Sequence, residues 1–142
     1  MDGHEFIEVA KSLAHSQREA WLRSAVSRAY YALLNSAIQF LSELGFSVEQ
    51  GPGAHGQTRN RLSNSTVEQM MDFSRILDEL RKRRNKADYD MSSSDFTNQA
   101  TCALRAAKAE SALALLVACK HEPQRSRIRA EIREYERLLG AA

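Results

Sequence analysis

Helix-breaking residues are scarce in this 142-residue chain, which has only two prolines and six glycines. Half of them fall within residues 46–56, and Pro123 marks a second break. Between the breaks, apolar residues recur every three or four positions, which is the period of one face of an α-helix. No segment shows the apolar–polar alternation of a β-strand. The sequence therefore predicts an all-α fold, an antiparallel bundle of long helices with additional short helices.

The expected helices are bounded by local start and stop signals. They cover residues 3–14, 16–44, 55–62, 65–89, 94–120 and 124–139. Two sequences of the form Ser-x-x-Glu, Ser16–Glu19 and Ser65–Glu68, match the capping box that opens a helix. Ser94 or Asp95 is expected to cap the fifth helix. The second helix carries two adjoining apolar faces, so we expect it to lie at the centre and to be contacted on two sides.

The last predicted helix is amphipathic. It places Ile128, Ile132, Tyr135 and Leu139 on one face, while acidic residues interrupt the basic residues of the other face. This pattern favours a helix packed on the bundle over one that binds a membrane surface or nucleic acid. The same helix could supply part of a dimer contact.

Composition places the chain among ordinary globular proteins, with 43% hydrophobic and 27% charged residues. Its length suits a single domain. No apolar run approaches the roughly 20 residues needed to span a bilayer, and the N-terminus lacks the pattern of a secretory signal. Two scattered cysteines without histidines at ligand spacing indicate reduced core residues, so we expect a cytoplasmic protein with no metal site and no cofactor. The net charge of +2 is too small to indicate a nucleic-acid partner by itself.

One position in the fourth predicted helix departs from the apolar pattern. Arg84 falls in line with Leu77, Leu80 and Ala87 on the stripe that should face the core. A guanidinium is costly to remove from water without a partner. Arg84 should therefore either face an acidic partner such as Asp88, one turn on, or lie at the rim of the core, where an anion can reach it.

Basic residues surround Arg84 at the end of the same helix. Arg81, Lys82, Arg83 and Lys86 spread positive charge around the helix end. Cations suit a helix C-terminus for purely structural reasons. The alternative is a contact with a phosphate backbone, joined by Arg59 and Arg61 from the preceding short helix. No run of aromatic residues accompanies the charge, so sequence-specific readout of bases is not indicated.

Three landmarks stand in order along the chain. They are Ser27-Arg28-Ala29-Tyr30-Tyr31-Ala32 on the second helix, His55-Gly56 after the glycine-rich loop, and Leu80 followed by Arg84-Asn85-Lys86-Ala87-Asp88-Tyr89 at the end of the fourth. Together they resemble the HEPN domain (higher eukaryotes and prokaryotes nucleotide-binding), in particular its small stand-alone prokaryotic members. The likeness covers about residues 5–120, and its motifs are AYYA and R-x-x-A-D-Y.

The resemblance implies one HEPN-like helical domain over residues 1–142 that forms homodimers and works in a toxin–antitoxin or defence system. Many family members are metal-independent ribonucleases whose motif is an arginine, a polar residue and, a few residues later, a histidine. Arg84 and Asn85 match the first half of that motif. Tyr89 stands where the histidine is expected, and no histidine lies between His55 and His121. Arg84, Asn85 and Tyr89 are therefore the catalytic candidates for RNA cleavage.

Other family members accompany a minimal nucleotidyltransferase. In that setting the chain would be a non-catalytic partner that binds the transferase, and the hydroxyl of Tyr89 would be a group that the transferase modifies.

Seven further residues are candidates for binding RNA or a nucleotide. They are Arg28, Tyr31, His55, Arg81, Arg83, Lys86 and Asp88. Each has a structural alternative: a tyrosine pair on a long helix commonly packs, and Asp88 suits a helix-end ion pair. His55 belongs to the site only if its loop folds back towards Arg84.

Overall fold

The computed structural model describes residues 3–141 and is helical throughout that range apart from turns and loops, which confirms the predicted all-α class. Its elements are α1 (Gly3–Ala14), α2 (Glu19–Glu43), α3 (Ala54–Leu62), α4 (Glu68–Tyr89), the 3₁₀ helix η1 (Ser94–Phe96), α5 (Gln99–Cys119) and α6 (Gln124–Ala141). Within the described residues, no helix combines the length and the apolar character needed to cross a membrane.

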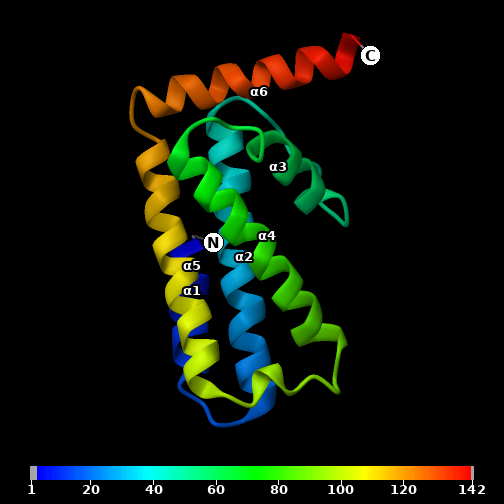
Figure 1. The fold of residues 1–142 in the computed structure, drawn as a ribbon, viewed down its shortest axis with the longest axis vertical. Helices are drawn as coiled ribbons and strands as arrows, with labels where there is room; N and C mark the ends of the chain where they lie inside the picture. Colours follow the sequence, from blue (N-terminus) through cyan, green and yellow to red (C-terminus); the bar gives the residue numbers. More distant parts are fainter. Residues whose placement is uncertain (1–2, 142) are drawn as a thin grey trace.

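Helix α2 lies at the centre of the bundle. It packs against α1, α4 and α5, and α4 and α5 also pack against each other. Successive long helices run in opposite directions, α6 crosses one end of the bundle, and α3 lies beside the upper part of α2 and α4 (Figure 1). This arrangement confirms that the second helix is central; contact on two sides was expected, and α1, α4 and α5 all contact it.

The core combines large side chains, many of them from α2 and α4, with a series of alanines on α5. Phe40 of α2 and Phe73 of α4 are fully buried in the main core cluster. Helix α5 contributes Ala106, Ala109 and Ala112, all buried, whose small side chains allow neighbouring helices to approach closely. The apolar stripe of α4 is thus covered along most of its length, and its last buried member is Ala87.

Both capping-box predictions are wrong. Helix α2 begins only at Glu19, because the Ser16 hydroxyl accepts a hydrogen bond from the backbone N–H of Arg18 (3.0 Å) in a local turn. The Ser65 hydroxyl likewise accepts from the N–H of Val67 (3.1 Å), so α4 begins at Glu68. Serine side chains that bond two residues ahead favour a turn before the helix instead of capping it.

The predicted cap of the fifth helix is also wrong. Ser94 and Asp95 belong to η1, and α5 begins after Asn98, whose side chain accepts from the N–H of Thr101 (3.2 Å). The cause is Phe96, which is fully buried in a small apolar cluster with residues of α2, α4 and α5. A short 3₁₀ turn inserts this ring into the core before the helix starts.

Helix α6 is packed on the bundle through its first half. Ile128 and Ile132 are buried, Tyr135 is half-buried, and Leu139 is 58% exposed. The predicted apolar face therefore continues beyond the part of α6 that the bundle covers.

Candidate functional site

Arg84 lies at the rim of the core, on the α4 stripe between buried Leu80 and buried Ala87. Its side chain is 20% exposed. Nε lies 3.0 Å from Oδ2 of Asp88, an ion pair whose angle falls outside hydrogen-bond geometry. Nη1 donates to Oδ1 of Asn85 (3.0 Å), and Nη2 donates to the hydroxyl of Tyr31 on α2 (2.6 Å). The acidic partner and the rim position proposed as alternatives are both present.

Three tyrosine rings surround the Arg84 guanidinium. Its central carbon lies 5.8 Å from the ring centre of Tyr30, 5.2 Å from that of Tyr31 and 5.6 Å from that of Tyr89. A cation beside aromatic faces is stabilised without losing its charge. The guanidinium is therefore held in a fixed position while its charge remains uncompensated except by Asp88.

A cleft of about 420 Å³ opens beside Arg84. Helices α2 and α4 form one wall, and the glycine-rich loop with the first turns of α3 forms the other. The lining residues are Tyr30, Tyr31, Leu34, Gly51, Pro52, Gly53, Ala54, His55, Gly56, Arg59, Arg81 and Arg84. The loop does fold back towards the arginine-rich helix, so Tyr31, His55, Arg81 and Arg84 meet at one place.

His55 is buried in the wall of this cleft and links three helices. Its Nδ1 lies 3.0 Å from the hydroxyl of Tyr30 on α2, and its Nε2 lies 3.4 Å from Oδ1 of Asp78 on α4. Burial lowers the pKa of His55 below its ordinary value, although the contact with Asp78 acts in the opposite direction. Burial also raises the pKa of Tyr30 to about 12. Both groups are therefore neutral at pH 7.

The cleft is predominantly basic. Arg59, Arg81 and Arg84 line it, and the nearest carboxylates are Asp78, 3.8 Å from Nη1 of Arg59, and Asp88 beside Arg84. Three guanidinium groups against two carboxylates give the cleft an excess of positive charge. A small anion or a phosphodiester suits this combination of fork-shaped donors.

The other basic residues at the end of α4, Lys82, Arg83 and Lys86, do not line the cleft. Arg83 and Lys86 both contact the carboxylate of Asp95, at 3.5 and 3.1 Å, on the side of α4 that faces η1. These contacts lower the pKa of Asp95 below its usual value, with the hydrogen bond from Lys86 as the largest cause. Lys82 is exposed and does not line the cleft. Arg83 and Lys86 therefore stay binding predictions without a place in the cleft.

Three other predicted residues also lie outside the cleft. Arg28 is exposed on α2, with its guanidinium carbon 5.8 Å from the ring centre of Phe6. Arg61, expected beside Arg59, donates to the carbonyl of Ser47 and to Glu136 of α6 (2.6 and 2.8 Å) and so fixes α3. Tyr89 is 74% exposed at the end of α4 and touches the site only through Arg84.

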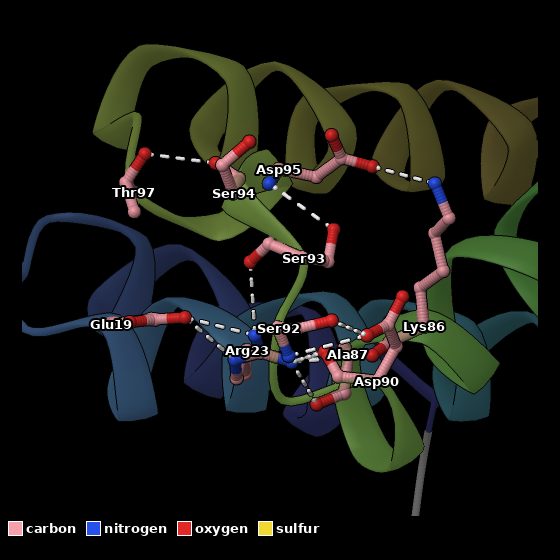
Figure 2. Close-up of polar contacts among 10 residues, drawn as sticks. All are labelled: Glu19, Arg23, Lys86, Ala87, Asp90, Ser92, Ser93, Ser94, Asp95 and Thr97. Atoms are coloured by element: carbon pink, nitrogen blue, oxygen red, sulfur yellow. Dashed lines mark hydrogen bonds and ion pairs between the residues drawn. The ribbon is translucent and has the colours of Figure 1, made fainter.

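Sequence reasoning missed the residue that fixes the end of α4. Arg23, only 7% exposed, donates from Nη1 to the carbonyls of Lys86, Ala87 and Asp90 and from Nη2 to that of Ser93, at 2.8–3.2 Å (Figure 2). Glu19 accepts from Nε and Nη2 of the same side chain. Arg23 is flanked by buried Leu22 and Val26 on α2. A charged residue between apolar residues of a helix is the sequence signal that pointed to a buried, structural arginine.

Asp78 was missed as well, because its role depends on a helix 23 residues away in sequence. Among the residues that the structure describes, no three histidine, cysteine or acidic side chains converge in a way that could hold a metal ion. Comparisons of the chain with protein families, with characterised proteins and with solved structures find no match to it.

Proposed function

We propose that this protein is a HEPN-like component of a toxin–antitoxin or defence system that binds the phosphate groups of RNA or of a nucleotide in the cytoplasm. The observation that supports it is the convergence of Arg59, Arg81 and Arg84 on one cleft. Arginine forks match phosphate oxygens in pairs and stay charged at every physiological pH. The tyrosines of the AYYA motif line the same cleft, which is consistent with the resemblance.

The cleft can also hold a base. Tyr30 and Tyr31 lie edge to face with ring centres 5.1 Å apart, beside the apolar side chain of Leu34. Aromatic rings next to cations are the usual surroundings of an unpaired base and its phosphate. A single-stranded RNA or a free nucleotide fits this site better than a duplex, because a cleft of about 420 Å³ admits one nucleotide at a time.

Metal-independent cleavage of the bound RNA is part of this proposal. Arg84 and Arg81 would stabilise charge on the phosphate, and Asn85 would keep Arg84 oriented through their 3.0 Å contact. The domain would act as a homodimer, as the resemblance implies.

A matched pair of substitutions tests the binding site. Arg81→Ala removes a cation that lines the cleft, whereas Lys82→Ala removes a neighbouring exposed cation that does not. We expect Arg81→Ala to weaken binding of a fluorescent single-stranded RNA about tenfold, as for the loss of one charge-assisted hydrogen bond, about 1.4 kcal/mol. Lys82→Ala should change the Kd less than twofold at the same salt concentration, because an exposed charge is screened.

Fluorescence anisotropy at fixed ionic strength measures both constants. Equal losses for the two variants would mean that only overall charge matters, and no loss for either would reject the cleft as the binding site. Arg81 is a better choice than Arg84 because Arg84 also joins α4 to Tyr31 on α2 and pairs with Asp88 on its own helix, so its removal disturbs the fold.

A second candidate function is supported by the exposure of Tyr89. The ring is 74% exposed at the end of α4, so its hydroxyl is accessible to another protein. In this alternative, a minimal nucleotidyltransferase binds here and transfers a nucleotide to Tyr89. Intact-mass measurement of the protein purified from its native cells should then show a nucleotidyl adduct that is absent from Tyr89→Phe. An unmodified wild-type mass would reject the alternative.

A further inference from the structure

Three titratable side chains from three helices form a connected chain that ends at the cleft. Asp78 of α4 lies 3.4 Å from Nε2 of His55 on α3, and Nδ1 of His55 lies 3.0 Å from the hydroxyl of Tyr30 on α2. His55 and Tyr30 are 7% and 3% exposed, and both line the cleft together with Arg81 and Arg84.

The order of these three side chains determines which nitrogen of His55 carries the ring proton. A carboxylate accepts hydrogen bonds and cannot donate them, so Nε2 of neutral His55 carries the ring proton and donates it towards Asp78. Nδ1 then holds the lone pair and accepts from the hydroxyl of Tyr30. Any proton that His55 takes up at Nδ1 must therefore come from Tyr30 or pass through it.

We infer that Tyr30 is the catalytic acid–base residue of the cleft, that His55 and Asp78 position and drive it, and that it takes the 2′-hydroxyl proton of a bound RNA. This inference rests on the proposed binding of RNA phosphates in the cleft. In this inference the histidine of the site is His55 of α3, which acts through Tyr30 of α2. The resemblance instead led us to expect a histidine a few residues after Arg84 on α4.

The reaction balances without a metal or a redox partner. The 2′-hydroxyl gives its proton to the oxygen of Tyr30 while the proton of Tyr30 moves to Nδ1 of His55, and the resulting imidazolium is paired with Asp78. The 2′-oxygen forms a bond to phosphorus, and the bond from phosphorus to the 5′-oxygen breaks. The 5′-oxygen keeps the electron pair and takes a proton from water, and the hydroxide so formed neutralises the proton that His55 later releases.

The guanidinium groups of Arg84 and Arg81 line the same cleft as Tyr30, close to where the phosphate would react. The guanidinium carbon of Arg84 is 5.8 Å from the ring centre of Tyr30, and both side chains line the cleft, so a phosphate bound by this arginine would lie beside the tyrosine. Negative charge that develops on the phosphate oxygens is stabilised by Arg84 and Arg81. The products are a 2′,3′-cyclic phosphate and a free 5′-hydroxyl.

The environment of His55 determines how the rate of RNA cleavage depends on pH. Its neighbours are Tyr30 of α2, Asp78 and Arg81 of α4, and Arg59 of α3. Burial lowers the pKa of His55 most; Asp78 raises it, and Arg81 and Arg59 lower it further. Because His55 must be neutral to accept a proton, the rate rises with pH through a limb that lies below the ordinary histidine value of 6.5. Tyr30, with a pKa of about 12, remains protonated there and needs His55 to act.

The experiment uses the full-length protein, a single-stranded RNA oligonucleotide and EDTA. A 2′-O-methyl RNA of the same sequence is the matched substrate control, and Tyr135→Phe on α6, outside the cleft, is the matched protein control. We expect the wild type to cleave the RNA, to leave the methylated strand intact and to produce a 2′,3′-cyclic phosphate end. Tyr30→Phe should lower kcat about a hundredfold with an unchanged Kd for RNA, and Tyr135→Phe should match the wild type.

Each other outcome contradicts the inference. A wild type that binds RNA but does not cleave it overturns the catalytic role and leaves the proposed binding function standing; no binding at all rejects both. Cleavage by Tyr30→Phe at the wild-type rate, or a 3′-hydroxyl product, also overturns it. If circular dichroism shows that Tyr30→Phe is unfolded, His55→Gln and the wild-type pH profile decide. A His55→Gln variant that cleaves at the wild-type rate, or a wild-type profile without an acid limb below pH 6.5, rejects the proposed roles of Tyr30, His55 and Asp78.

Discussion

Arg23 and Arg84 both lie on largely apolar helix faces but have different roles. Arg23 gives all of its donors to internal acceptors, namely four backbone carbonyls and Glu19, and is nearly fully buried. Arg84 has one carboxylate, one amide and one tyrosine hydroxyl as partners and remains 20% exposed at a cleft. Burial of a guanidinium is tolerated where its donors are satisfied, so Arg23 is a structural residue.

The role of Arg23 predicts a large loss of stability on its removal. Arg23→Met keeps most of the apolar stem but leaves buried carbonyls at the end of α4 without a donor. We expect the free energy of unfolding to fall by about 3 kcal/mol, measured by urea denaturation. Arg75→Met is the matched control on α4, since its side chain is 62% exposed and pairs only loosely with Glu79, and it should change stability by less than about 0.5 kcal/mol. Equal effects would contradict the proposed role.

At the scale of the elements, helix α4 is fixed at both ends by other helices. Arg23 of α2 binds its last carbonyls. At the other end, the carboxylate of Glu131 on α6 accepts from the backbone N–H and hydroxyl of Thr66 (2.8 and 2.6 Å) and from the hydroxyl of Ser65 (2.7 Å). A carboxylate at a helix N-terminus is favourable because unpaired N–H groups point towards it. The position of Arg84 and Asp88 in space therefore depends on α2 and α6 as much as on α4.

The contact of Glu131 predicts a pH-dependent loss of stability. Burial opposes ionisation of this carboxyl, but the hydrogen bonds from Thr66 and Ser65 outweigh it, and the pKa of Glu131 is lowered. The native state thus favours the ionised form, so the contact stabilises the fold above the unfolded value of 4.5 and weakens as the pH falls below it. Glu131→Gln should cost about 1 kcal/mol at pH 7.

The difference between wild type and Glu131→Gln should shrink when denaturation is repeated at pH values below 4.5. Glu134→Gln, exposed on the same helix and paired only with Arg137, is the control and should change stability little. A difference between wild type and Glu131→Gln that does not depend on pH would argue against the contact.

At the scale of the whole molecule, the cleft exists because α3 is attached to three different helices. His55 joins it to Tyr30 on α2 and to Asp78 on α4, and Arg61 joins it to Glu136 on α6. These contacts hold the glycine-rich loop against the bundle, so that the loop and α3 form one wall of the cleft while α2 and α4 form the other. The position of α6 across the end of the bundle therefore contributes to the site without lining it.

The amino-acid sequence by itself determined the fold class and most helix extents. The period of apolar residues places α1 over Gly3–Ala14 and ends α4 at Tyr89, as expected, because burial of one helix face is a property of spacing alone. The same spacing put Arg84 on the stripe that faces the core, where an acidic partner or a position at the rim was expected. Local start signals were less informative: Ser16, Ser65 and Ser94 failed as caps because each side chain or its neighbour had a competing local bond or a buried ring to accommodate.

Only the tertiary structure decided which of the basic and polar residues work together. Arg81 and Arg84 face the cleft while Arg83 and Lys86 pair with Asp95, although all four lie within two turns of one helix. The link from Asp78 through His55 to Tyr30 joins residues 23 and 25 positions apart on three helices. Helical period fixes the face of a residue on its own helix, but contacts between helices depend on how the helices pack, and no local pattern encodes that packing.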